Sequence, residues 1–146
     1  FMIEMVRKTI RESEENPELF KFIFDSFQFL DETKLPFGNI HLYFMMELTN
    51  HLGFIPNGEC DEGTPYFDMR EGIFIPVHAN HPHYLDDYKS ELLSMILHTP
   101  IEECHEIEMD REMRNIMVRH ILDYYRLHID NFPTIHSHGI LKEVLG

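Results

Sequence analysis

The stretch that decides the fold runs from Asn39 to Gly72 and reads NIHLYFMMELTNHLGFIPNGECDEGTPYFDMREG. Its first half is apolar and aromatic at helical spacing, which predicts a helix over Asn39 to Leu52 that supplies much of the core. We expect Gly53 to end this helix in the left-handed conformation, which glycine adopts at little cost. A loop then returns the chain as the segment from Tyr66 to Ile75.

This returning segment has the pattern of a short β-hairpin. Two runs rich in aromatic and β-branched residues, Tyr66 to Met69 and Ile73 to Ile75, flank the turn pair Glu71-Gly72. We expect Gly72 to supply a positive φ there, and we expect no other sheet. The predicted fold class is therefore mostly α, a helical domain with one small β-hairpin insertion.

Further helices are predicted on both sides of this stretch, because apolar residues recur at spacings of three and four. Asn16 followed by Pro17 is typical of a helix start, since Asn caps free N–H groups and Pro fits the first turn. The expected helices run from the first residue to about Glu15, from Pro17 to the turn at Lys34 to Gly38, from Leu85 to about His98, from a capping box at Thr99 to about Glu106, from Asp110 to about His128, and from Ser137 to the end.

The helix that begins at Pro17 has phenylalanine and leucine on nearly every side. A helix with one solvent-exposed face does not tolerate such a pattern, which indicates a central core helix. The alternative is a peptide-binding groove edged by some of these phenylalanines.

Composition limits the function classes. With 146 residues, 43% of them apolar, the chain is long enough for one domain over 1–146 with a real core. No secretory signal and no apolar run of about 18 residues is present, so we expect a soluble cytoplasmic chain. Twelve basic against 26 acidic side chains give a net charge of −14, so the average surface repels a nucleic-acid backbone.

The residues that can carry chemistry are few. No glycine-rich phosphate loop, nucleophile elbow or HExxH pair occurs, so we predict no enzymatic activity. The exception is a loop with His78, His81 and His83, which the hairpin brings near Cys60; three imidazoles and a thiolate are a possible zinc shell. A small metal-dependent enzyme on these residues is one alternative, and a purely structural helical module is another. Cys60 and Cys104 are expected to be reduced thiols.

Several motifs in order resemble one known family. They are LxxHLGFxP at 48–56, YFDxxEG at 66–72, YYRxH at 124–128 and LKEVL at 141–145. The chain resembles the C-terminal helical domain of the RecO recombination-repair proteins, in the form found in Bacteroidetes-like members. In relatives that bind zinc, two CxxC pairs frame the hairpin, whereas here Gly63 stands at the second cysteine position. The resemblance therefore implies no cofactor, with zinc reduced at most to a remnant of Cys60, His78, His81 and His83.

The resemblance also implies a function in DNA recombination, within the RecF pathway. Such proteins join an N-terminal OB-fold, which binds and anneals single strands, to this helical half. Because Phe1 leads into a helix without a capping residue, we expect the chain to be cut from a longer one. The resemblance implies that the OB-fold precedes it and that single-stranded DNA binds only there. The implied partners are RecR and the acidic, phenylalanine-ended tail of single-stranded DNA-binding protein, and no membrane.

Such a tail needs an apolar seat with cations at its rim. Two sets of residues offer this combination, and the sequence does not choose between them: Phe20, Lys21, Phe24 and Lys34, or Arg114, Arg119 and Arg126.

Overall fold

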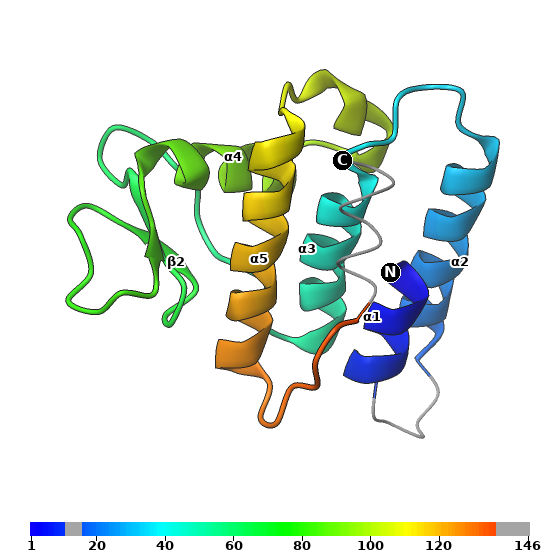
Figure 1. Cartoon of the computed structure of the whole chain (residues 1–146), viewed down its shortest axis with the longest axis horizontal. Coiled ribbons are helices and arrows are strands. Elements are labelled where there is room, and N and C mark those ends of the chain that lie inside the picture. The colour runs from blue at the N-terminus through cyan, green and yellow to red at the C-terminus, as the bar shows by residue number, and fades with distance from the viewer. Residues whose placement is uncertain (11–15, 137–146) are drawn as a thin grey trace.

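The computed structural model describes residues 1–10 and 16–136. The elements in chain order are α1 (Met2–Thr9), α2 (Pro17–Glu32), α3 (Ile40–Leu52), β1 (Tyr66–Asp68), β2 (Ile73–Ile75), β3 (Tyr84–Leu85), α4 (Asp87–His98), the 3₁₀ helix η1 (Ile101–Glu106) and α5 (Arg111–His128). Figure 1 shows α3 in the middle, with α5 on one side and α1 and α2 on the other, and the small sheet at the end away from α2. The predicted mostly helical fold with a small β insertion is confirmed.

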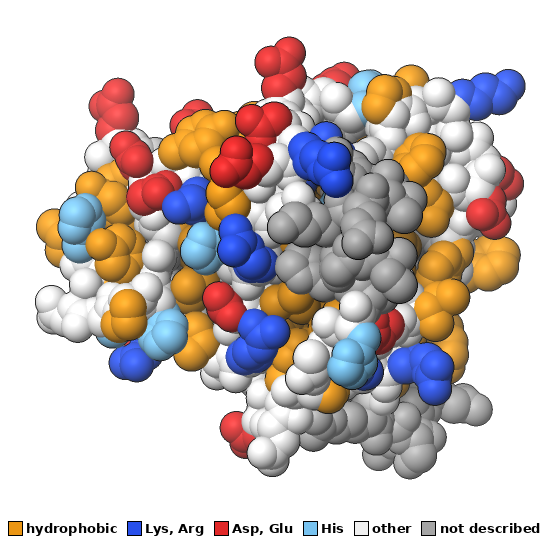
Figure 2. Space-filling view, in the orientation of Figure 1, with side chains coloured by type: hydrophobic (Ala, Val, Ile, Leu, Met, Phe, Trp, Pro, Cys, Tyr) orange, Lys and Arg blue, Asp and Glu red, His pale blue; other side chains and the backbone are white. Residues whose placement is uncertain are grey.

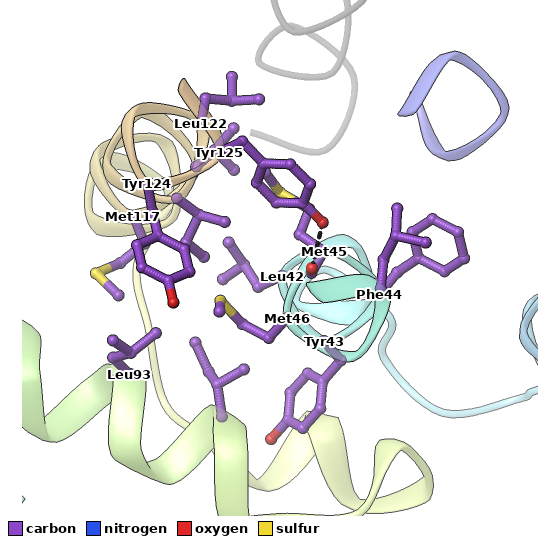
Figure 3. Close-up of a cluster of buried hydrophobic side chains, with 14 of the residues drawn as sticks. Leu42, Tyr43, Phe44, Met45, Met46, Leu93, Met117, Leu122, Tyr124 and Tyr125 are labelled. Carbon is purple, nitrogen blue, oxygen red and sulfur yellow. Dashed lines mark hydrogen bonds between the residues drawn. The ribbon is translucent and has the colours of Figure 1, made fainter. Parts of the chain in front are cut away.

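Helix α3 is the centre of the core, as its composition predicts. Nine of its 13 residues are buried. Side chains from α5 and α4 point toward it, among them Tyr125 and Leu93 (Figure 3). Gly53 ends the helix with φ 91°, and the next amide, of Phe54, donates to the Thr49 carbonyl oxygen at 2.9 Å. The predicted left-handed stop is confirmed.

Helix α2 begins as predicted but lies elsewhere in the fold. The Asn16 side chain accepts a 3.0 Å hydrogen bond from the Leu19 amide, which is the expected cap. The prediction of a central helix is wrong, because Phe20 and Phe24 are 67% and 68% exposed. Only the opposite stripe packs on α3, where Phe22 stacks on a core phenylalanine at 5.1 Å between ring centroids. Helix α2 is thus a peripheral helix with an apolar outer ridge.

The sheet contains the predicted hairpin and one more strand. Strand β1 pairs antiparallel with β2, Phe67 opposite Phe74, and Gly72 takes φ 69° in the turn. Strand β3 pairs with the other edge of β1, so the sheet has the order β2-β1-β3 and is larger than expected. Leu85, expected at the start of the fourth helix, belongs to β3, and α4 starts at Asp87.

The later helices follow the prediction except at one cap. The short helix ends at Glu106 as expected, but it has 3₁₀ geometry and no side-chain cap bond, so the capping box at Thr99 is wrong. The Asp110 side chain caps α5 by accepting from the Met113 amide at 2.8 Å. The first helix was predicted to run to about Glu15, but α1 ends at Thr9, because Ile10 takes extended backbone with φ −89° and ψ 108°. Residues 11–15 and the helix predicted after Ser137 fall outside the described residues. In the described ranges, no helix combines the length and the apolar character needed to cross a bilayer.

Candidate functional site

The histidine loop is held by hydrogen bonds within the sheet region. The Nδ1 atom of His81 accepts from the His83 main-chain amide at 3.1 Å. A main-chain N–H can only donate, so this ring nitrogen carries no proton, and the neutral ring has its proton on Nε2. Nε2 lies 3.1 Å from Oδ1 of Asp68, which also accepts from the amides of Arg70 and Glu71. Both ring nitrogens of His81 are therefore engaged, and the ring connects the histidine loop to Asp68.

The other members of the predicted metal cluster are engaged separately. The His78 ring packs edge-on against Tyr66 at 4.4 Å between centroids and stacks on Tyr84 at 5.4 Å. The Cys60 sulfur lies 3.6 Å from the Pro65 carbonyl oxygen. Over residues 1–10 and 16–136, no three His, Cys, Asp or Glu side chains form a group that can hold a metal ion. The absence of zinc remains a prediction, but the four proposed ligands do not form one shell.

Both cysteines are free thiols without the environment of a reactive nucleophile. Cys104 is buried and Cys60 is half-buried. Burial raises the pKa of both thiols, and the carboxylates of Glu91, Asp61 and Asp87 raise the pKa of Cys60 further. A reactive thiol needs the opposite shift, so neither cysteine is suited to nucleophilic catalysis.

The arginine candidates lie on α5. Arg119 and Arg126 are exposed and seven residues apart, which places them on one side of the helix about two turns from each other. Arg126 pairs with Asp123 at 2.6 Å. Figure 2 shows Lys and Arg side chains spread along the course of α5. The structure therefore brings most of the predicted arginine set to one surface.

Arg114 occupies a more enclosed place near the start of α5. Its guanidinium lies against Gly38, where an added Cβ would be 2.3 Å from Nη1. Nη2 donates to the Met109 carbonyl oxygen at 3.4 Å. Arg114 borders a hollow of about 510 Å³ whose apolar side includes Ile107 and Met109. A cation and apolar surface thus meet at this end of the helix.

The other candidate set forms the outer ridge of α2. Phe20 and Phe24 are exposed one turn apart, and Lys21 beside them pairs with Asp25 at 2.5 Å. Lys34 is exposed, two residues beyond the helix end. Since α2 and α5 lie on opposite sides of α3, the ridge of Phe20 and Phe24 on α2 and the arginines of α5 are on separate surfaces (Figure 1).

The structure gives the YYRxH motif a role that the sequence reasoning missed. Tyr124 donates from its hydroxyl to the Phe54 carbonyl oxygen at 2.5 Å. The His128 ring stacks on the Phe54 ring at 5.4 Å, with 3° between the planes, and Nε2 donates to the Met69 carbonyl oxygen at 2.8 Å. Two motifs distant in sequence, YYRxH and LGFxP, are thereby joined to the β1–β2 turn. The only sign of this contact in the sequence was that YYRxH and LGFxP occur together in the pattern of one family.

Comparison with known proteins agrees with these linked motifs. The family model for the C-terminal part of recombination protein O matches residues 1–137. The chain belongs to the RecO family. It is 33% identical over 146 residues to DNA repair protein RecO of Phocaeicola vulgatus, covering 100% of this chain and 61% of that protein. It is 36% identical over 146 residues to DNA repair protein RecO of Christiangramia forsetii, covering 100% and 60%.

The RecO of Flavobacterium johnsoniae is also similar, at 34% identity over 147 residues, covering 100% of this chain and 60% of that protein. The chain thus spans about three fifths of the length of these curated relatives, 61% and 60% of the first two. No solved structure gives a significant match. The resemblance that the sequence motifs suggested is confirmed at the level of the family.

Proposed function

We propose that this RecO chain is the protein-binding half of a recombination mediator in DNA repair and acts by contacts rather than catalysis. The relatives' shared name, DNA repair protein RecO, supports the repair role. The net charge of −14 argues against tight binding of nucleic acid by these residues alone. We assign binding and annealing of single-stranded DNA to an N-terminal OB-fold domain, and contact with RecR to the assembled protein.

We further propose that α5 docks the acidic tail of single-stranded DNA-binding protein. The observation that carries this proposal is the position of four of the chain's twelve basic residues on one helix: Arg111, Arg114, Arg119 and Arg126. In so acidic a chain, an acidic ligand is attracted only where basic side chains gather.

The hollow beside Arg114 is the seat proposed for the terminal phenylalanine. It offers the side chains of Ile107 and Met109, and the positive end of α5 lies beside it. Glu108 and Asp110 also border the hollow and repel an acidic ligand. The attraction by the arginines of α5 must therefore exceed the repulsion by these two carboxylates. We therefore expect micromolar affinity that falls as salt increases, because rim charges are screened over about 10 Å at 0.1 M.

The test is titration of a tail peptide against the chain, beside a peptide that lacks the final phenylalanine. The tail peptide should bind, and its truncated form should bind about tenfold more weakly. Equal binding by both, or none by either at millimolar concentration, would remove this domain from the docking role.

Paired variants distinguish the two candidate surfaces. Arg119→Gln with Arg126→Gln removes two charges from α5, and Lys21→Gln with Lys34→Gln removes two charges near α2. We expect about tenfold weaker tail binding for the arginine pair and little change for the lysine pair. The reverse result, with loss also on Phe24→Ser, would move the site to the α2 ridge.

Gly38→Ala tests the hollow without changing charge. The new Cβ needs the space of the Arg114 guanidinium, which must shift. Tail affinity should fall severalfold. Gly63→Ala is the matched control, since its Cβ would meet only Asp61 Oδ1 at 3.3 Å on an exposed loop. Unchanged affinity in Gly38→Ala would place the phenylalanine elsewhere.

A further inference from the structure

A second groove lies between α2, α3 and the junction of α4 with η1. Its volume is about 480 Å³, within the usual range for sites that accept a ligand or a few side chains. Apolar residues from each of the segments around it line the groove, including Phe22 and Phe29 from α2, Met46 from α3, Ile55 from the loop after α3 and Ile96 from α4. The groove faces the inner side of α2, whereas Phe20 and Phe24 form the opposite ridge.

The charge of this groove is negative. Among the described residues, its lining contains the carboxylates of Asp25, Glu47 and Glu102 and no lysine or arginine. The last turn of α4 also lines it through Ile96 to His98, and a helix C-terminus carries partial negative charge. Asp25 is paired with Lys21 and Glu47 accepts from Asn50, both on the exposed surface, where such pairs are weak. The groove therefore attracts cations and repels an acidic tail.

A buried polar group in the lining has no partner among the described residues. Tyr43 is 5% exposed, and within residues 1–10 and 16–136 its hydroxyl makes no hydrogen bond. The Thr99 side chain lies close enough to lower the pKa of the Tyr43 hydroxyl, although the hydroxyl makes no hydrogen bond within the described residues. Burial, the largest cause, raises the pKa of Tyr43 to about 12, so the hydroxyl stays protonated.

Figure 3 shows the Tyr43 side chain extending from α3 toward the ribbon of α4 and η1, where the groove is. A buried hydroxyl without a hydrogen-bond partner destabilises the folded protein, and a ligand that supplies the missing hydrogen bond removes this cost. The hydroxyl oxygen can accept a hydrogen bond from an ammonium or guanidinium group. The unpartnered atom and the negative rim thus favour the same kind of ligand.

We infer that this groove binds a basic, partly apolar segment of a partner protein. One apolar side chain of the segment lies against the phenylalanines of α2 and Met46. A neighbouring lysine or arginine reaches Glu47 and Glu102 at the rim and donates to the Tyr43 hydroxyl. This groove is a different site from the one proposed on α5 for the acidic tail. Because the two ligands have opposite charge, an experiment can reject one proposal and leave the other standing.

The experiment uses two synthetic eight-residue peptides and the 146-residue chain. One peptide alternates leucine with arginine, and the other alternates leucine with glutamate. Binding is measured by isothermal titration at fixed salt, with amide chemical shifts to locate the site. The arginine peptide should bind and shift the amides of the groove residues. No binding at millimolar concentration, or equal binding of the glutamate peptide, would overturn the inference.

A matched pair of variants separates the groove from general attraction to an acidic protein. Glu47→Gln with Glu102→Gln removes two rim charges, and Glu62→Gln with Glu112→Gln removes two exposed charges that do not line the groove. The two rim substitutions should lower the affinity for the arginine peptide about tenfold, and the two control substitutions should change this affinity less than about twofold. Equal weakening by both pairs would show nonspecific attraction and overturn the inference.

Tyr43→Phe tests the unpartnered hydroxyl. Affinity for the arginine peptide should fall about threefold to tenfold, because the bound segment loses an acceptor. The urea midpoint of the free variant should not fall, because the hydroxyl has no bond to lose there. A variant that is less stable but binds as well as the parent would overturn the role given to this hydroxyl.

Discussion

The hydroxyl of Tyr125 donates a 2.5 Å hydrogen bond to the main-chain carbonyl oxygen of Met45 in α3. Both residues are 0% exposed, and Figure 3 shows the bond crossing from α5 to α3 inside the core. The bond satisfies a polar group that burial would otherwise destabilise. It fixes how α5, which carries the arginines, is placed on the central helix.

Tyr125→Phe should lower the free energy of unfolding by about 1 to 2 kcal/mol, because a buried hydrogen bond is lost while the ring still fills the core. Urea denaturation measures the change. Tyr88→Phe is the control, since Tyr88 is 52% exposed and its hydroxyl should contribute little. Equal stability of the parent and Tyr125→Phe would contradict the importance of this bond.

Gly72→Ala should be clearly more destabilising than Gly58→Ala. Both glycines have positive φ, 69° and 85°, so alanine is strained at either position by about 1 kcal/mol. At Gly72 the new Cβ would also be 3.0 Å from the Tyr124 hydroxyl, whereas at Gly58 it would meet a Phe74 ring carbon at 3.7 Å.

The Gly72 prediction has an internal check. In a Tyr124→Phe background the obstructing hydroxyl is gone, so the additional cost of Gly72→Ala should shrink toward that of Gly58→Ala. A double-mutant cycle measures this coupling from urea midpoints. Purely additive effects would show that the contact with Tyr124 is unimportant.

Stability should fall with pH below about 6.5 through His120. Burial, then the charge of Lys89, lowers the pKa of His120 in the folded chain. The unfolded chain therefore binds a proton at higher pH than the folded chain, and acid favours unfolding from the ordinary value of 6.5 downward. The contribution is fully present above that value.

Urea midpoints from pH 7.5 to 5 test this prediction. His120→Asn should reduce the loss of stability toward low pH, whereas His78→Asn, at an exposed position, should leave the His120 contribution in place. The same pH slope in the parent and in His120→Asn would contradict it.

Removal of metal should leave the melting temperature unchanged. His81 already uses both ring nitrogens, and Phe67 and Phe74 are buried at 1% and 7% exposure within the sheet region. Burying such rings stabilises by roughly 1.5 to 3 kcal/mol each, which makes a structural zinc dispensable. Thermal melts with EDTA, then with added zinc, give the answer. A drop of many degrees with EDTA that zinc restores would contradict it.

The sequence by itself determined the local features. Gly53 and Gly72 have the positive φ that their positions predict, and Asn16 caps the helix that it was predicted to start. These outcomes depend on a few neighbouring residues, so local rules suffice. The family motifs, which lie in fixed order along the chain, were also visible without a structure.

Tertiary structure alone decided where those elements lie. Helix α2 has phenylalanine or leucine on nearly every side, yet Phe20 is on the surface, because only the inner stripe of the helix packs on α3. Leu85 joined a strand because the free edge of β1 was available to pair with it, which no local pattern indicates. The acidic groove beneath Tyr43 is built from α2, α3 and the α4–η1 junction, so its charge and its unpartnered hydroxyl exist only once distant segments pack together.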